Sequence, residues 1–196
     1  MELLFISEDH SFWLGDRRLP SVTYILKHFI PRYMCDEWYL DRGTAVHKAT
    51  ELYDKETLDP ESVDPQIEGY LRAWIRFRED YEFIPEHIEL QAYHPVYMYA
   101  GIIDRIGKSG EDRVLLDIKT GEPSKSDRLQ IAGGYYSMVT DNITICHPLY
   151  LHSDGTYDKP RAYSRNEIRE AQNAWLSMVT TFNFLLKERI IEWTTT

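Results

Sequence analysis

Residues 100–121 read AGIIDRIGKSGEDRVLLDIKTG, and this stretch decides the fold. Its apolar runs, 100–106 and 113–119, are separated by the turn sequence KSGED and therefore predict an antiparallel pair of strands. Residues two apart share one face of a strand, so Asp117 and Lys119 point the same way. The apolar residues before Asp117 indicate a buried strand, where two charged groups are costly unless they serve a function.

Asp104 lies on the first of these strands. Antiparallel pairing brings it toward Asp117 at the end of the pair away from the turn. Two carboxylates converging beside Lys119 predict a Mg²⁺ or Mn²⁺ site, in which the oxygens bind the ion and the lysine orients or polarises the attacking water. From the spacing alone, a salt-bridged surface hairpin is an equally good interpretation.

The other segments predict one domain over residues 1–196, an α/β fold with helices on the faces of a sheet. β-branched and aromatic runs predict a hairpin of residues 2–6 and 11–18 and further strands over 88–98 and 143–152. Periodicity, caps and prolines predict helices from the Ser21 cap to Pro31, over 42–55 with Ala45, Ala49, Leu52 and Tyr53 inward, from Asp64-Pro65 to about Tyr81, over 127–139, and after the Ser164–Glu167 capping box.

Composition limits the class of protein. The 196 residues carry a formal net charge of −10, which counts against a nucleic-acid partner because phosphate contacts normally use a basic surface. Carboxylates that bind divalent cations are repulsive only until the metal arrives, so the basic residues need to line only one groove. No apolar run approaches the roughly 18 residues that a membrane span requires, and the N-terminus lacks the basic region of a secretory signal.

The two cysteines, Cys35 and Cys146, form no Cys-x-x-Cys pair. Structural zinc sites and iron–sulfur clusters usually need four such ligands, so neither is expected. We expect two reduced thiols in a cytoplasmic protein.

Four further residues are weak signals when taken singly. His47 lies on the helix predicted over 42–55, and Glu89 begins a strand; either could be an ordinary packed or surface residue. Gln130 and Tyr135, on the helix after the second aspartate strand, offer hydrogen bonds and a ring face to a nucleotide. Ordinary amphipathic packing explains them equally well.

Taken in order, these elements resemble the PD-(D/E)XK nuclease superfamily, most closely its RecB-like branch and the small phage-type exonucleases. The resemblance implies a restriction-endonuclease-like core, with a mixed central sheet flanked by helices, and metal-assisted hydrolysis of DNA phosphodiester bonds. The matching pieces are LPSVTYIL (19–26), RGTAVHKATE (42–51), IELQAY (88–93), AGIIDRIG (100–107), LLDIKTG (115–121) and LQIAGGYY (129–136).

The resemblance implies roles residue by residue. His47, Asp104 and Asp117 would bind one or two Mg²⁺ or Mn²⁺ ions, with the backbone carbonyl of Ile118 as a further ligand. Lys119 would take the catalytic lysine position. Glu89, the glutamate before the first aspartate, would reach a second metal or a bound water.

Gln130 resembles the start of the family's Gln-x-x-x-Tyr motif, with one departure. The tyrosine position falls on Gly134, and Tyr135 comes one residue late. On a regular helix four residues return to nearly the same face, whereas five do not. A local bulge at Gly133-Gly134 would be needed to restore the motif.

We therefore expect a Mg²⁺- or Mn²⁺-dependent DNA exonuclease of recombination, repair or replication, in the cytoplasm of a bacterium or a phage-infected cell. It would act on DNA with a free end, and its partners would be a recombination protein or further copies of the chain. The alternatives are a non-catalytic DNA-end-binding accessory protein and a structure-specific endonuclease of the same superfamily. Expected substrate contacts are Arg42, Lys48, Lys125, Arg128, Gln130 and Tyr135.

Overall fold

A computed structural model describes residues 2–30, 37–139 and 142–193. Its central sheet has the strand order β4-β5-β6-β7, formed by Phe83–His94, Tyr99–Ser109, Asp112–Lys119 and Ile145–Tyr150. The first three strands are antiparallel, and β7 lies parallel to β6. The predicted strand pair is confirmed, with its turn at Gly110, and the sheet is mixed. Pro31 and Cys35 lie outside the described residues, and Cys146 of β7 is a buried free thiol.

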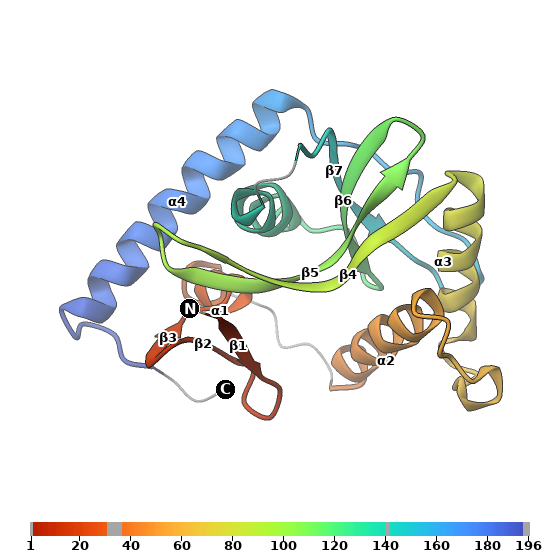
Figure 1. The fold of residues 1–196 in the computed structure, drawn as a ribbon, viewed down its shortest axis with the longest axis horizontal. Coiled ribbons are helices and arrows are strands. Elements are labelled where there is room, and N and C mark those ends of the chain that lie inside the picture. The colour runs from red at the N-terminus through yellow and green to blue at the C-terminus, as the bar shows by residue number, and fades with distance from the viewer. Residues whose placement is uncertain (1, 31–36, 140–141, 194–196) are drawn as a thin grey trace.

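Helices cover both faces of this sheet (Figure 1). One face packs against α1 (Val22–Phe29), the π-helix η2 (Leu129–Tyr135) and α4 (Arg165–Lys187). The other packs against α2 (Glu37–Asp54) and α3 (Glu68–Asp80). The chain is thus a mixed α/β protein with one helical layer on each face, and among its described helices none is long and apolar enough to cross a membrane.

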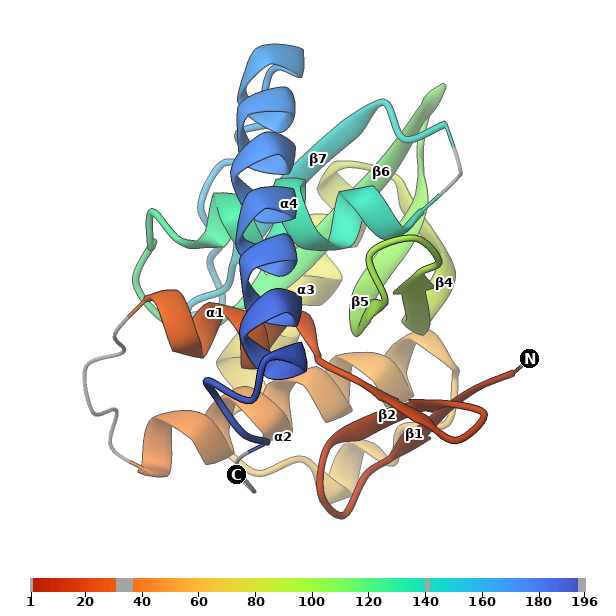
Figure 2. The same ribbon diagram turned by 90° about the vertical axis from the view of Figure 1, so that its left-hand side faces the viewer.

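A second, small sheet lies at the N-terminus, where the sequence predicts only a hairpin. Residues 11–18 are divided by a turn at Gly15, whose φ is +61°, so β1 (Leu3–Ile6), β2 (Ser11–Leu14) and β3 (Arg17–Leu19) form three antiparallel strands. Figure 2 shows this sheet beneath the β4–β5 hairpin. It is joined to β5 where the Ala100 amide donates to the Pro20 carbonyl at 2.9 Å.

The predicted caps of two helices are confirmed. The Ser21 hydroxyl accepts from the Tyr24 amide, and Ser164 and Glu167 form the reciprocal capping box of α4. The cap predicted at Asp64 is wrong: its carboxylate accepts from the Gln66 amide in a separate turn, and α3 begins only at Glu68. Local side-chain hydrogen bonds fix the starts of α1 and α4, whereas the N-cap of α3, Ile67, has none.

Other boundaries differ from the prediction. The helix predicted over 42–55 begins at Glu37. Of its predicted inward stripe, Ala49 is buried and Ala45 and Tyr53 are partly buried against the core, while Val46 and Thr50 are buried as well. The strand predicted over 88–98 runs from 83 to 94, because the segment 95–98 forms a turn. The last strand is shorter than the predicted 143–152.

The helix predicted over 127–139 is present from Asp127 to Met138, but most of it is the π-helix η2, followed by the 3₁₀ turn η3 (Tyr136–Met138). Its two glycines permit a close approach to neighbouring helices. A Cβ atom on Gly133 would lie 2.7 Å from the Trp175 Cβ of α4, and one on Gly134 would lie 2.8 Å from the Val22 Cγ1 of α1. The wide turn is therefore packed between α1 and α4.

Candidate metal centre

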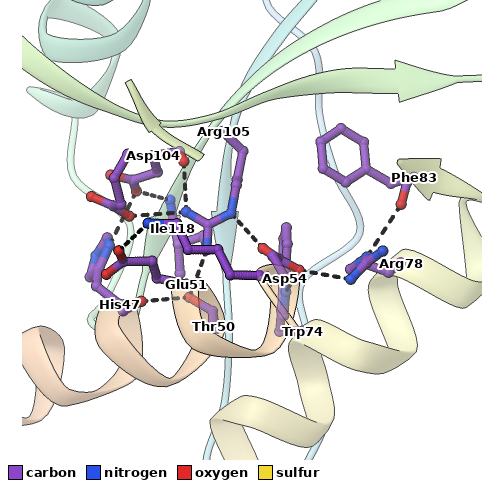
Figure 3. Close-up of polar contacts among 12 residues, drawn as sticks. His47, Thr50, Glu51, Asp54, Trp74, Arg78, Phe83, Asp104, Arg105 and Ile118 are labelled. Carbon is purple, nitrogen blue, oxygen red and sulfur yellow. Dashed lines mark hydrogen bonds and ion pairs between the residues drawn. The ribbon is translucent and has the colours of Figure 1, made fainter. Parts of the chain in front are cut away.

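Three side chains from separate elements converge beside the central sheet. His47 comes from α2, Glu89 from β4 and Asp104 from β5, and one nitrogen or oxygen of each lies within 4.8 Å of the others. The Nδ1 of His47 is 3.5 Å from the Oδ2 of Asp104 (Figure 3). Asp104 is buried, whereas His47 and Glu89 are partly exposed. Of the sequence-predicted ligands, His47 and Asp104 are thus brought together, and Glu89 joins them.

The strand backbone is irregular at this point. Alternation along a strand would send Asp104 and Arg105 to opposite faces. Instead both side chains contact α2, Asp104 through His47 and Arg105 through Asp54. Across the ladder, Glu89 has a φ of +51°, a left-handed conformation that is rare for a residue with a side chain. Such irregularities are frequent near functional sites.

Burial and mutual repulsion oppose ionisation of the two carboxylates of this group. Burial and the nearby Asp104 carboxylate raise the pKa of Glu89 to about 7. Burial, with the neighbouring Asp117, raises the pKa of Asp104 as well, and burial lowers the pKa of His47. Two close carboxylates and an imidazole fit a divalent cation, whose charge would favour both ionised carboxylates and a neutral imidazole.

A second group of contacts adjoins the first. The Lys119 Nζ lies 2.6 Å from the Asp117 Oδ2 and donates to the Gln130 Oε1 at 3.0 Å. Burial lowers the pKa of Lys119, but the effects of Asp117 and nearby acids outweigh it, so that the pKa lies above its ordinary value. This shift favours the protonated form of Lys119, which can donate hydrogen bonds.

Asp117 approaches the centre from β6 rather than joining the three-residue group. The ladder between β5 and β6 ends at the pair Arg105–Leu116, and the Asp104 Oδ2 instead accepts from the Ile118 amide at 2.6 Å. Asp117 and Asp104 line the same cavity. Metal ligation by Asp117 and by the Ile118 carbonyl stays a prediction.

The π-helix provides the i+5 contact that the glutamine–tyrosine spacing requires. The Gln130 Nε2 donates to the Tyr135 hydroxyl at 3.0 Å, and the two residues are five apart. The wider turn at Gly133-Gly134 thus brings both side chains to one face, as the predicted bulge would. A continuous set of contacts runs from Asp117 through Lys119 and Gln130 to Tyr135.

These groups line a cavity of about 290 Å³ together with His47 and Asp104. The N-terminal sheet and its first turn contribute Phe5, His10 and Phe12 to the lining, with Phe5 and His10 stacked at a centroid distance of 5.9 Å. Sequence reasoning did not assign these residues to the site. Phe5 and Phe12 are partners across the β1–β2 hairpin, but nothing local shows that this hairpin lies against Asp104 and Asp117.

The predicted phosphate contacts are placed around the site with differing availability. Arg42 donates to the Thr120 carbonyl at 2.7 Å and lies over the ring of Trp38. The Lys48 ammonium pairs with Glu51 at 2.9 Å. Lys125 is exposed on the segment after β6, and Arg128 is 3.8 Å from a Glu170 oxygen on α4. Their role in DNA binding stays a prediction.

Comparison of the sequence with models of known protein families and with curated protein sequences finds no match. The functional assignment therefore depends on the order of the motifs and on the chemistry of the site. In the site, His47 and Asp104 share one cavity with Asp117 and Lys119, and Glu89 lies close to the first two.

Proposed function

We propose that this protein is a Mg²⁺- or Mn²⁺-dependent DNA nuclease of the PD-(D/E)XK type, with a restriction-endonuclease-like core and exonuclease activity. The observation that carries the proposal is the convergence of His47, Glu89 and Asp104, two of which line one cavity with the Asp117–Lys119 pair. A purely structural salt bridge between Asp117 and Lys119 would not need two more carboxylates and an imidazole beside it. The pKa values of all three of these groups are shifted.

A divalent cation in this centre would supply Lewis acidity toward a phosphate and would lower the pKa of a water molecule. The chain contributes the rest of the chemistry. The protonated Lys119, fixed between Asp117 and Gln130, can orient the attacking water and stabilise negative charge that develops on the phosphate oxygens. Gln130 and Tyr135 line the cavity as hydrogen-bonding groups for the substrate.

We prefer an exonuclease to an endonuclease because the order of the motifs resembles the phage-type exonucleases. Phe5, His10 and Phe12 line the same cavity as His47 and Asp104. The aromatic rings also offer surfaces on which an unpaired base can stack.

The test is digestion of end-labelled single- and double-stranded DNA with Mg²⁺ or Mn²⁺, beside a closed circular DNA. We expect release of nucleotides from linear DNA and none from the circle. Cleavage of the circle would favour a structure-specific endonuclease, and metal-independent binding without any cleavage would favour an accessory protein.

Matched variants assign any activity to this site. Asp104→Asn and Asp117→Asn are nearly isosteric and should abolish cleavage, whereas Glu111→Gln, in the exposed β5–β6 turn, should cleave normally. Full activity of either aspartate variant would contradict the assignment. Circular dichroism of each variant checks that the fold is retained.

A further inference from the structure

We propose that Arg105 is a positioning residue of the metal centre: its guanidinium fixes Glu89 and the backbone of Asp104 in the arrangement that a cation requires. The inference rests on the proposed function, because it takes the ligand of this site to be a divalent cation. It concerns a residue that lies directly after Asp104 in the chain and that is fully buried in the folded protein.

Each nitrogen of the Arg105 guanidinium has an assigned partner (Figure 3). The Nε lies 2.6 Å from the Asp54 Oδ2, and the Nη2 donates to the Thr50 hydroxyl at 3.2 Å. The Nη1 lies 2.9 Å from the Glu89 Oε1 and donates to the carbonyl of Asp104 at 2.6 Å. One planar group therefore joins α2 to two of the three candidate ligands.

Asp54 gives this group a rigid support. Its side chain is fully buried at the end of α2, and its Oδ1 accepts from the Trp74 indole at 3.0 Å and from the Arg78 guanidinium at 2.8 Å. Both donors belong to α3. Arg78 also donates to the Phe83 carbonyl at the start of β4. The Asp54 carboxylate, on α2, is thus held by two donors of α3 in addition to Arg105.

Stability alone is a poor explanation for this arrangement. Apolar residues of similar volume often replace buried ion pairs without loss of stability, so such a pair is weak evidence for a stabilising role. The arginine instead directs one nitrogen to a carboxylate whose residue holds a left-handed backbone conformation, with φ of +51° at Glu89. A residue in that conformation keeps its side-chain direction only when its surroundings hold it.

The same contacts explain why arginine and not lysine occupies the position. A guanidinium presents its donors in a fixed planar fork, whereas an ammonium is a single point charge on a flexible stem. Lysine at this position could pair with Asp54 or with Glu89, but it could not reach both together with Thr50. The two carboxylates would then lose their fixed relation.

The experiment measures Mn²⁺ binding to the full chain by isothermal titration calorimetry, without DNA. Partners that orient metal ligands typically contribute about 10- to 100-fold in affinity. We therefore expect Arg105→Met to weaken Mn²⁺ binding about 10-fold or more. Arg105→Lys, which keeps the buried charge, should also weaken Mn²⁺ binding. Circular dichroism and thermal melting accompany each titration.

Arg78→Met is the matched control. Arg78 also binds Asp54, but it contacts neither Glu89 nor Asp104 through its guanidinium in any bond described above. Its loss should lower the melting temperature while Mn²⁺ affinity stays within about two-fold, because it removes support without removing a ligand contact. If the role of Arg105 were purely structural, Arg105→Lys would likewise lower the melting temperature while Mn²⁺ affinity stayed within about two-fold.

A double-mutant cycle shows whether Arg105 acts through Glu89. If it does, Arg105→Lys should weaken Mn²⁺ binding far less in a Glu89→Gln background than in the wild-type chain. Equal effects in both backgrounds, or a folded Arg105→Lys with wild-type affinity, would overturn the inference.

The outcomes also separate this inference from the proposed function. A wild-type chain that binds Mn²⁺ in an Arg105-dependent way but cleaves no DNA would support the positioning role and contradict the nuclease. A wild-type chain that binds no Mn²⁺ would contradict both.

Discussion

At the scale of single residues, the site is defined by charges that are unfavourable without a partner. Glu89 and Asp104 have raised pKa values because burial and a neighbouring carboxylate both oppose ionisation. Lys119, by contrast, keeps its proton because Asp117 lies beside it. We therefore propose that the acids bind a cation and that the lysine donates hydrogen bonds.

Removal of the lysine should therefore affect the reaction and not the binding of metal. We expect Lys119→Ala to lower the single-turnover rate of DNA cleavage about 100-fold or more, the typical effect of losing one donor that stabilises a developing charge. Mn²⁺ affinity, measured by calorimetry, should change little. Lys108→Ala removes an exposed lysine at the far end of β5 and should leave both quantities unchanged.

At the scale of elements, the π-helix η2 is the feature that adapts the chain to its site. It gives Gln130 a partner five residues later in Tyr135, and it packs its glycines between α1 and α4. The sequence shows the irregular spacing and the two glycines. It does not show that the helix widens, because that depends on packing against residues distant in the chain.

The packing can be tested by adding one methyl group. Gly133→Ala would place a Cβ 2.7 Å from the Trp175 Cβ and 2.8 Å from the Ala171 carbonyl oxygen. We expect a loss of about 1–3 kcal/mol in the free energy of unfolding, measured with urea, as is usual for an overpacked core. Gly121→Ala meets no atom within 4 Å and should change it by less than about 0.5 kcal/mol. A stable Gly133→Ala protein would contradict the packing described for η2.

The capping box of α4 predicts a dependence of stability on pH. The Arg161 guanidinium and the Ser164 amide and hydroxyl lower the pKa of Glu167 to about 2 from its ordinary value of 4.5. A carboxyl with a lowered pKa in the folded state stabilises the fold above about pH 4.5, and this stabilisation is lost as the pH falls toward 2.

Glu167→Ala should accordingly destabilise the protein at pH 7 and do so progressively less between pH 4.5 and 2. Urea unfolding across this range measures the difference, with Glu170→Ala, exposed on the same helix, as the control. A loss in Glu167→Ala that is independent of pH would contradict the role of the charge.

At the scale of the whole molecule, local signals in the sequence predict more than distant ones do. The Ser21 and Ser164 caps and the strand pair around KSGED are confirmed, since each depends on residues within a few positions. The third N-terminal strand is also local, since β3 pairs with β2 across the turn at Gly15, but the sequence pattern predicts a single strand over residues 11–18. The Arg105–Asp54 pair joins residues 51 positions apart, and nothing local indicates such a partner.

The net charge of −10 is also a property of the whole molecule. An acidic chain can bind a polyanion only where cations, either basic side chains or bound metal, offset its charge. Three of the four predicted phosphate contacts are engaged with other groups of the protein. We therefore expect a divalent cation to occupy the centre before DNA binds.

The most direct test of that claim is the anomalous scattering of Mn²⁺ in crystals of the protein soaked with the ion. We expect a peak within ligand distance of His47, Glu89 and Asp104, which is lost in Asp104→Asn. A fully soaked crystal with its Mn²⁺ peaks elsewhere, and none at these three side chains, would contradict it.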